Sequence, residues 1–169
     1  MNIFCIDTCP IQSARWLCDQ HCNKMVLESA QMLANCFNSE TLADAPKAKS
    51  GNVRKHSYYN HPCSIWVRKT KENMIWLILH ALEMEEERLR RGFNPHFSVS
   101  FIEWCAENVA RSLVPDGDQT DFAIAISEDK DCRKHPAFYS LDTVGKYRLY
   151  YSFDKKFAKW TQNKPNWIN

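Results

Sequence analysis

The sequence has few glycines and no long hydrophobic run. Only four of its 169 residues are glycine, and the longest apolar stretch, MIWLILHAL around Trp76, is interrupted by His80. That stretch is too short to span a bilayer, and 25% charged with 44% hydrophobic residues fits a folded domain better than a disordered chain. The first residues, MNIFCIDTCP, lack the basic and apolar regions of a secretory signal. We therefore expect one compact cytoplasmic domain spanning residues 1–169, in reducing surroundings.

Several motifs of cofactor chemistry are also missing. The sequence contains no Walker A loop, no dinucleotide-binding fingerprint, no H-E-x-x-H and no C-x-x-C pair, which argues against NTP-driven, Rossmann and zincin chemistry. Cys18, His21 and Cys22 lie close together, but no second ligand pair follows at the spacing of a zinc finger. We expect no metal and no cofactor, and we expect the eight scattered cysteines to be reduced, several of them packed as small hydrophobic side chains.

Positive charge is unevenly distributed, although the net charge is only +2. Residues 45–71 contain seven lysines and arginines and no acid, and residues 146–164 contain six against Asp154 alone. Two basic segments in a nearly neutral chain indicate a protein that binds anions on one face.

The pattern of caps and apolar residues predicts an all-α fold of about four helices, with a short extended N-terminus and a long basic loop over residues 38–62. Residues 122–126 (FAIAI) fit a short buried strand or helix equally well. The expected helices run from a cap at Ser13 to about Phe37, from Ser64 or Thr70 to Arg91 before Gly92, from a capping box Ser100-x-x-Glu103 to about Leu113, and from a cap at Asp142 through Phe157 and Trp160.

Four polar residues recur at helical spacing within LCDQHCNKMVLESAQML, residues 17–33: His21, Lys24, Glu28 and Gln31. On a helix with 3.6 residues per turn this row borders the apolar arc. A glutamate partly removed from water there can act as a general acid or base, which makes Glu28 a candidate. The alternative is a simple Lys24–Glu28 ion pair at the edge of the core, contributing a few tenths of a kcal/mol.

A second candidate region, KHSYYNHPCSIWVRK at residues 55–69, interleaves basic and aromatic residues. Cations neutralise phosphates, and flat rings stack on bases. The alternative is a turn fixed by Asn60 and Pro62, with the aromatic side chains packed inward, and this is the interpretation we favour for Tyr58 and Trp66. The candidate substrate contacts in this region are Arg54, Lys55, His56, Tyr59, Asn60, His61 and Arg68.

Four motifs occur together in order: Asp19-Gln20-His21 followed by Glu28, then Asn60-His61-Pro62, then Glu87 followed by Arg91-Gly92-Phe93-Asn94, and finally Lys164-Pro165-Asn166-Trp167. On these motifs the chain resembles the pyrimidine-dimer DNA glycosylases of the phage endonuclease V type and their bacterial relatives. The resemblance follows most of the chain but is weak over residues 98–160.

The resemblance implies a compact all-α enzyme that bends duplex DNA, flips a base out and attacks the sugar C1′ with its own N-terminal amine. A Schiff base would form, and β-elimination could then nick the strand. An α-amine titrates near 8, so a useful neutral fraction exists at pH 7. On this basis Met1, Glu28 and His21 are the expected catalytic residues, with Asn2, Lys24 and Gln31 as substrate contacts.

The sequence also departs from the family pattern. Asn2 is bulky for the removal of the initiator methionine, so the amine would belong to Met1. The arginines that the phage enzymes carry near the amino end and around the glutamate are missing, and Arg15 and Lys24 are the expected substitutes. Another modified base or a free nucleotide therefore remains an alternative substrate to a dimer in duplex DNA. A non-catalytic nucleic-acid-binding or nucleotide-binding protein on the same scaffold is the alternative function.

Overall fold

The computed structural model describes residues 1–168, and within them all regular structure is helical, as predicted. None of these helices combines the length and apolar character that a membrane span requires. The α-helices are α1 (Pro10–Arg15), α2 (Asp19–Ala34), α3 (Ser39–Ala43), α4 (Pro62–Val67), α5 (Lys71–Arg90), α6 (Val99–Glu107) and α7 (Thr143–Asp154), with short 3₁₀ turns at Val109–Arg111, Asp131–Lys134 and Phe138–Ser140.

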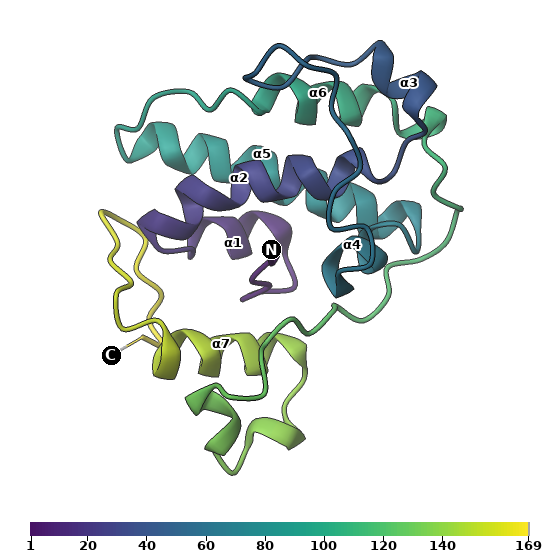
Figure 1. The fold of residues 1–169 in the computed structure, drawn as a ribbon. Helices are drawn as coiled ribbons and strands as arrows, with labels where there is room; N and C mark the ends of the chain where they lie inside the picture. Colours follow the sequence, from purple (N-terminus) through teal and green to yellow (C-terminus); the bar gives the residue numbers. More distant parts are fainter. Residues whose placement is uncertain (169) are drawn as a thin grey trace.

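The long helices α2 and α5 pack side by side and form the centre of the fold (Figure 1). Helix α1 packs on α5, and α6 packs on both α5 and α2. Helix α7 lies on the opposite side of the N-terminal segment from α1 and α2 (Figure 1). Residues 2–6 are buried without being helix or strand. The N-terminus is therefore enclosed by the fold, next to α2.

The structure divides the predicted first helix into α1 and α2, so the expectation of one helix from Ser13 to Phe37 was wrong. The Arg91 side chain explains the break. Its guanidinium donates to the backbone oxygens of Arg15 and Leu17, both at 2.8 Å, and to Asp19 Oδ1 at 2.9 Å. The carbonyls of Arg15 and Leu17 therefore bond to the guanidinium at the point where α1 ends. The next helix, α2, begins at Asp19.

Four other local predictions need correction. The Ser100–Glu103 capping box does not form, because α6 begins two residues earlier and has Ser98 at its N-cap without a side-chain hydrogen bond. Helix α6 ends at Glu107, well before Leu113, and α7 ends before Phe157 and Trp160. Residues 122–126 are neither strand nor helix.

Side-chain bonds account for the irregular backbone of residues 122–126. The Tyr147 hydroxyl donates to the carbonyl of Ala123 at 3.1 Å and accepts from the N–H of Ala125 at 2.9 Å. These bonds satisfy backbone groups that a strand or helix would otherwise pair.

The predicted caps at Thr70 and Asp142 are confirmed, as is Gly92 at the end of α5 with φ +80°. A left-handed residue at this position ends a helix with little strain only when it is glycine. The boundaries of α5 and the start of α7 are therefore fixed by local signals.

His80 is fully buried in α5, and we predict that His80→Leu flattens the loss of stability in acid. Within residues 1–168 neither ring nitrogen has a hydrogen-bond partner, and burial lowers the pKa from 6.5 to about 3. Between these two pKa values His80 is protonated in the unfolded chain but not in the folded one. The free energy of unfolding therefore falls by up to about 1.4 kcal/mol per pH unit as pH drops from 6.5 toward 3.

Urea unfolding at several pH values in this window measures the effect. His80→Leu should also be as stable as the wild type at pH 7, or more stable by up to about 2 kcal/mol, because two unsatisfied ring nitrogens disappear. Parallel pH profiles for the two proteins would contradict the prediction.

Candidate active site

The carboxylate of Glu28 lies at the N-terminus of the chain. Its Oε2 accepts a hydrogen bond from the backbone N–H of Asn2 at 2.9 Å and lies 3.6 Å from the amine of Met1. Its Oε1 lies 3.4 Å from Lys24 Nζ. Glu28 is only 8% exposed, so these nitrogens compensate for much of the water that the carboxylate has lost.

Met1 is oriented with its side chain in the core and its amine toward the cavity. The side chain is 2% exposed while the residue as a whole is half-buried, so its exposed surface lies mainly at the backbone end. The Ser64 hydroxyl, at the start of α4, lies 3.5 Å from the Met1 sulfur. His61 lies close enough that the amine, after burial, lowers its pKa while Glu28 raises it. The Asn60-His61-Pro62 motif thus lies beside the amine and the carboxylate.

Asn2 fixes the conformation of the N-terminal segment. Its Oδ1 accepts from the N–H groups of Ile3 and Phe4 at 2.8 and 2.9 Å, and its Nδ2 donates to the carbonyl of Ala125 at 2.8 Å. Phe4 has φ +52°, which is strained for a residue with a side chain. The structure therefore shows Asn2 as an anchor for the amine, and its predicted contact with substrate stays a prediction.

His21 is buried beneath the same segment. Its ring stacks on Phe4 with centroids 4.0 Å apart, and its Nδ1 shares a hydrogen bond with the Tyr151 hydroxyl. Burial first, and then Lys155 and Lys24, lower the pKa of His21 to about 3. The imidazole is therefore neutral at pH 7, which suits a residue that positions Phe4 and Tyr151 better than one that transfers protons.

A cavity of about 500 Å³ opens over the amine and Glu28. Its charged groups are Lys24, Lys155, the amine and Glu28, so positive charge predominates. The side chain of Lys155 was missed by sequence reasoning, because the basic run over residues 146–164 did not indicate which lysine turns inward. The lining residues are Met1, Asn2, Phe4, Gln20, His21, Lys24, Met25, Glu28, Ala125, Tyr150, Lys155 and Phe157.

Gln31 is not part of this cavity, although it shares the predicted row with Glu28. It lines a neighbouring hollow of about 470 Å³ together with Arg54, Lys55 and His56 of the basic loop. No aspartate or glutamate is among the residues that line this hollow. The polar row of α2 is therefore divided between two adjacent sites.

Arg54 is the most unusual residue of this second hollow. It is only 8% exposed, its guanidinium lies 4.4 Å from the centre of the Phe101 ring, and burial lowers its pKa. Its one hydrogen bond among the described residues is a long one to Ser98 Oγ at 3.5 Å, and its Nε has no partner there. Burying a cation without a carboxylate partner costs free energy, and a bound anion would offset that cost. This favours an anion-binding site at Arg54.

Arg68 braces the loop that precedes α4. It donates to the carbonyls of Tyr59 and Ser64 at 2.6 and 3.0 Å, and its guanidinium lies 3.4 Å from the centre of the Tyr59 ring. Trp66 is buried as predicted, but the expectation that Tyr58 packs inward was wrong, because Tyr58 is 66% exposed with φ +49°.

Other sequence motifs serve to hold the scaffold. Glu87 is fully buried and pairs with Arg91 at 2.8 Å, so this part of the Glu87-to-Asn94 motif anchors α1, α2 and α5. Arg15 pairs with Glu83 at 2.7 Å and does not line the Glu28 cavity, so its expected role beside Glu28 was wrong. No cluster of three or more potential metal ligands is found among residues 1–168.

A family model described as pyrimidine dimer DNA glycosylase matches residues 1–100, which include Met1, Glu28 and the Asn60-His61-Pro62 motif. The chain belongs to the pyrimidine dimer DNA glycosylase family. Membership implies a glycosylase-type function on DNA. No curated protein and no solved structure matches the chain. The residues after 100, among them Lys155 and Tyr151, lie outside the matched range.

We predict that Asn2→Ala lowers the free energy of unfolding by about 1–3 kcal/mol, because two buried N–H groups and the partly buried carbonyl of Ala125 lose their partner. Asn52→Ala is the matched control, since Asn52 is exposed and within residues 1–168 its side chain bonds only to Ser50 Oγ. Its effect should stay within about 0.5 kcal/mol. Urea unfolding measures both variants, and equal losses would show that Asn2 does not anchor the terminus.

Proposed function

We propose that this protein is a DNA glycosylase with lyase activity that uses the amine of Met1 as nucleophile and Glu28 as general acid and base. The observation that carries the proposal is the 3.6 Å distance between that amine and the Glu28 carboxylate, at the floor of a largely positive cavity. A nucleophile beside a base, with the base held by a third group, is the arrangement that covalent catalysis requires. Here the N–H of Asn2 holds the carboxylate.

The chemistry follows from this pair. Glu28 accepts a proton from the ammonium, and the neutral amine attacks C1′ of the damaged nucleotide. The bond from C1′ to the base breaks, the departing base takes up a proton, and the sugar ring opens to leave an imine between C1′ and the nitrogen of Met1. Loss of a proton from C2′ then expels the 3′ phosphate by β-elimination. We expect the nucleotide to be turned out of the base stack so that the amine can reach C1′.

The basic side chains around the cavity suit the phosphates on either side of that nucleotide. Lys24 and Lys155 line the cavity, and His61 lies beside the amine. We assign phosphate contacts to these residues and to Arg54, Lys55 and His56 around the second hollow. Tyr59, Asn60 and Arg68 form the braced loop between the two regions, and Gln31 faces the second hollow.

A non-catalytic DNA-binding protein is the second candidate, and the Lys24–Glu28 ion pair at 3.4 Å favours it. In that case Glu28 would only balance the charges around it. The two candidates differ in what a change at Glu28 does to turnover.

Sodium borohydride should trap a covalent adduct between the protein and DNA that contains an abasic site, by reducing the imine. Glu28→Gln keeps an acceptor for the Asn2 N–H but cannot move protons, so we expect strand nicking to fall by about 10²–10⁴-fold. Glu86→Gln, an exposed glutamate of α5, is the matched control and should keep full activity. If Glu28→Gln nicked DNA as fast as the wild type, the non-catalytic binding protein would be favoured. The same would follow if the wild type bound abasic DNA but formed no adduct with it.

The position of the amine can be tested on its own. A Gly-Ser extension before Met1 moves the amine away from Glu28, so adduct formation should disappear, whereas the same extension after Asn169 should leave it unchanged. Mass mapping of the trapped peptide should place the adduct on Met1. An adduct on a lysine would overturn the assignment of the nucleophile.

We predict that Arg54→Met weakens binding of duplex DNA without lowering stability. Methionine fills the space of a buried cation that has no carboxylate partner, so the free energy of unfolding should stay the same or rise by up to about 2 kcal/mol. Losing one phosphate contact should reduce the slope of log K against log salt by about 0.9. Arg111→Met, which removes a half-exposed arginine paired with Asp44, is the control. Unchanged affinity and slope would show that Arg54 does not contact DNA.

A further inference from the structure

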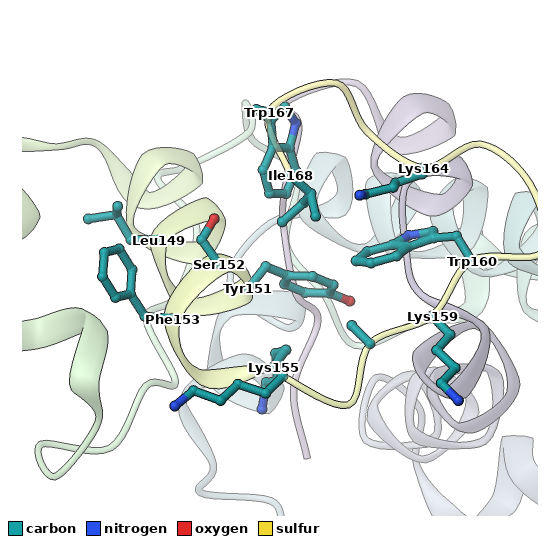
Figure 2. A pocket seen from close by; sticks show the side chains of 12 residues that line it. Leu149, Tyr151, Ser152, Phe153, Lys155, Lys159, Trp160, Lys164, Trp167 and Ile168 are labelled. Carbon is teal, nitrogen blue, oxygen red and sulfur yellow. The ribbon is translucent and has the colours of Figure 1, made fainter.

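A third hollow lies between α7 and the chain that follows it, and we call it the C-terminal groove. Its volume is about 860 Å³, and all the residues that line it lie beyond the matched range (Figure 2). They are Leu149, Tyr151, Ser152, Phe153, Lys155, Lys156, Ala158, Lys159, Trp160, Lys164, Trp167 and Ile168.

Four lysines line the groove, and Asp131, an acid close enough to Lys156 for that lysine to lower its pKa, is not part of the lining. Neither aspartate nor glutamate is among the lining residues, and within residues 1–168 none of the four lysines forms an ion pair. The nearest acid in sequence, Asp154, accepts hydrogen bonds from the N–H groups of Asp131 and Cys132 at 2.8 and 2.9 Å. Like charges gathered in one hollow favour an occupant with several negative charges.

Aromatic rings form part of the same groove. The indole N–H of Trp160 donates to the carbonyl of Trp16 at 2.8 Å, which fixes the ring while the residue stays half-buried. Figure 2 shows Lys164 and Trp160 together on one side of the hollow, with Tyr151 reaching toward Trp160. A fixed aromatic face among cations suits a nucleotide, because the base stacks on the ring and the phosphates meet the lysines.

The groove and the Glu28 cavity share a wall. Lys155 lines both, and the hydroxyl of Tyr151 shares a hydrogen bond with His21 of the cavity. The two hollows therefore lie side by side, and Glu28 is the one acid among the residues that line them.

We propose that the C-terminal groove binds an unpaired stretch of the same DNA strand that enters the Glu28 cavity, with one base stacked on Trp160 and the phosphates beside Lys156, Lys159 and Lys164. This inference rests on the proposed function for the identity of the strand. It adds a site for single-stranded DNA that works independently of the chemistry at Glu28.

Binding of a fluorescent oligothymidylate without any lesion, followed by anisotropy over a range of salt concentrations, tests the groove. Lys159→Gln with Lys164→Gln should reduce the slope of log K against log salt by about 1.4, since each single-strand phosphate contributes about 0.7. The charge-matched control is Lys71→Gln with Lys134→Gln, whose lysines pair with Asp116 and Asp131 outside the groove. Equal slopes for the two double variants would overturn the proposal.

Trp160 gives a second and independent readout. Trp160→Leu should weaken oligothymidylate binding by roughly tenfold to a hundredfold, whereas Trp160→Phe keeps a ring and should bind nearly as the wild type does. Both variants lose the bond to Trp16, so the comparison separates stacking from folding. Equal weakening in the two variants, or polyglutamate binding as tightly as the oligonucleotide, would show that no base stacks there.

The test is separable from that of the proposed function. Glu28→Gln should keep full affinity for oligothymidylate while losing nicking. Groove variants should still form the borohydride adduct when abasic DNA is saturating. Loss of the adduct with intact groove binding therefore counts against the imine chemistry alone.

Discussion

The arrangement of the site depends on one buried interaction, the contact of the Glu28 carboxylate with the first two residues of the chain. A carboxylate that is 8% exposed needs donors, and it takes them from the N–H of Asn2 and the amine of Met1. The same contact holds the amine beside the cavity that Met1 and Glu28 line. The same contacts thus satisfy a buried charge and position the amine, and the strained backbone of Phe4 is held in place by Asn2 and by the His21 ring.

A second buried ion pair determines where that carboxylate points. Arg91 is paired with the fully buried Glu87 and takes the backbone oxygens between α1 and α2, so it sets where α2 begins. Since Asp19 is bound to the same guanidinium, the first turn of α2 is fixed to the end of α5. Burying these charges costs desolvation, which the multiple hydrogen bonds of the guanidinium offset. The interaction fixes the direction of α2 and with it the position of Glu28.

Local signals predicted much of this fold. Thr70, Gly92 and Asp142 could be identified because a cap depends on the residue itself and its nearest neighbours. The break between α1 and α2 could not, because its cause is an arginine more than seventy residues away. Glu28 emerged from helical spacing together with a family resemblance, whereas Lys155 required knowledge of how α7 packs. Gln31 was grouped with Glu28 by spacing alone, and spacing does not show where one cavity ends and another begins.

Residues after 100 form part of the cavity whose other residues lie within the matched range 1–100. The pair formed by Met1 and Glu28 comes entirely from residues 1–100, but Ala125, Tyr150, Lys155 and Phe157 form the other wall of its cavity. Ala125 also accepts the hydrogen bond that anchors Asn2, so the amine itself depends on this later segment. A carboxylate and an amine open to water would lose most of their electrostatic coupling. The later segment therefore shields the pair from water and adds positive charge to the cavity.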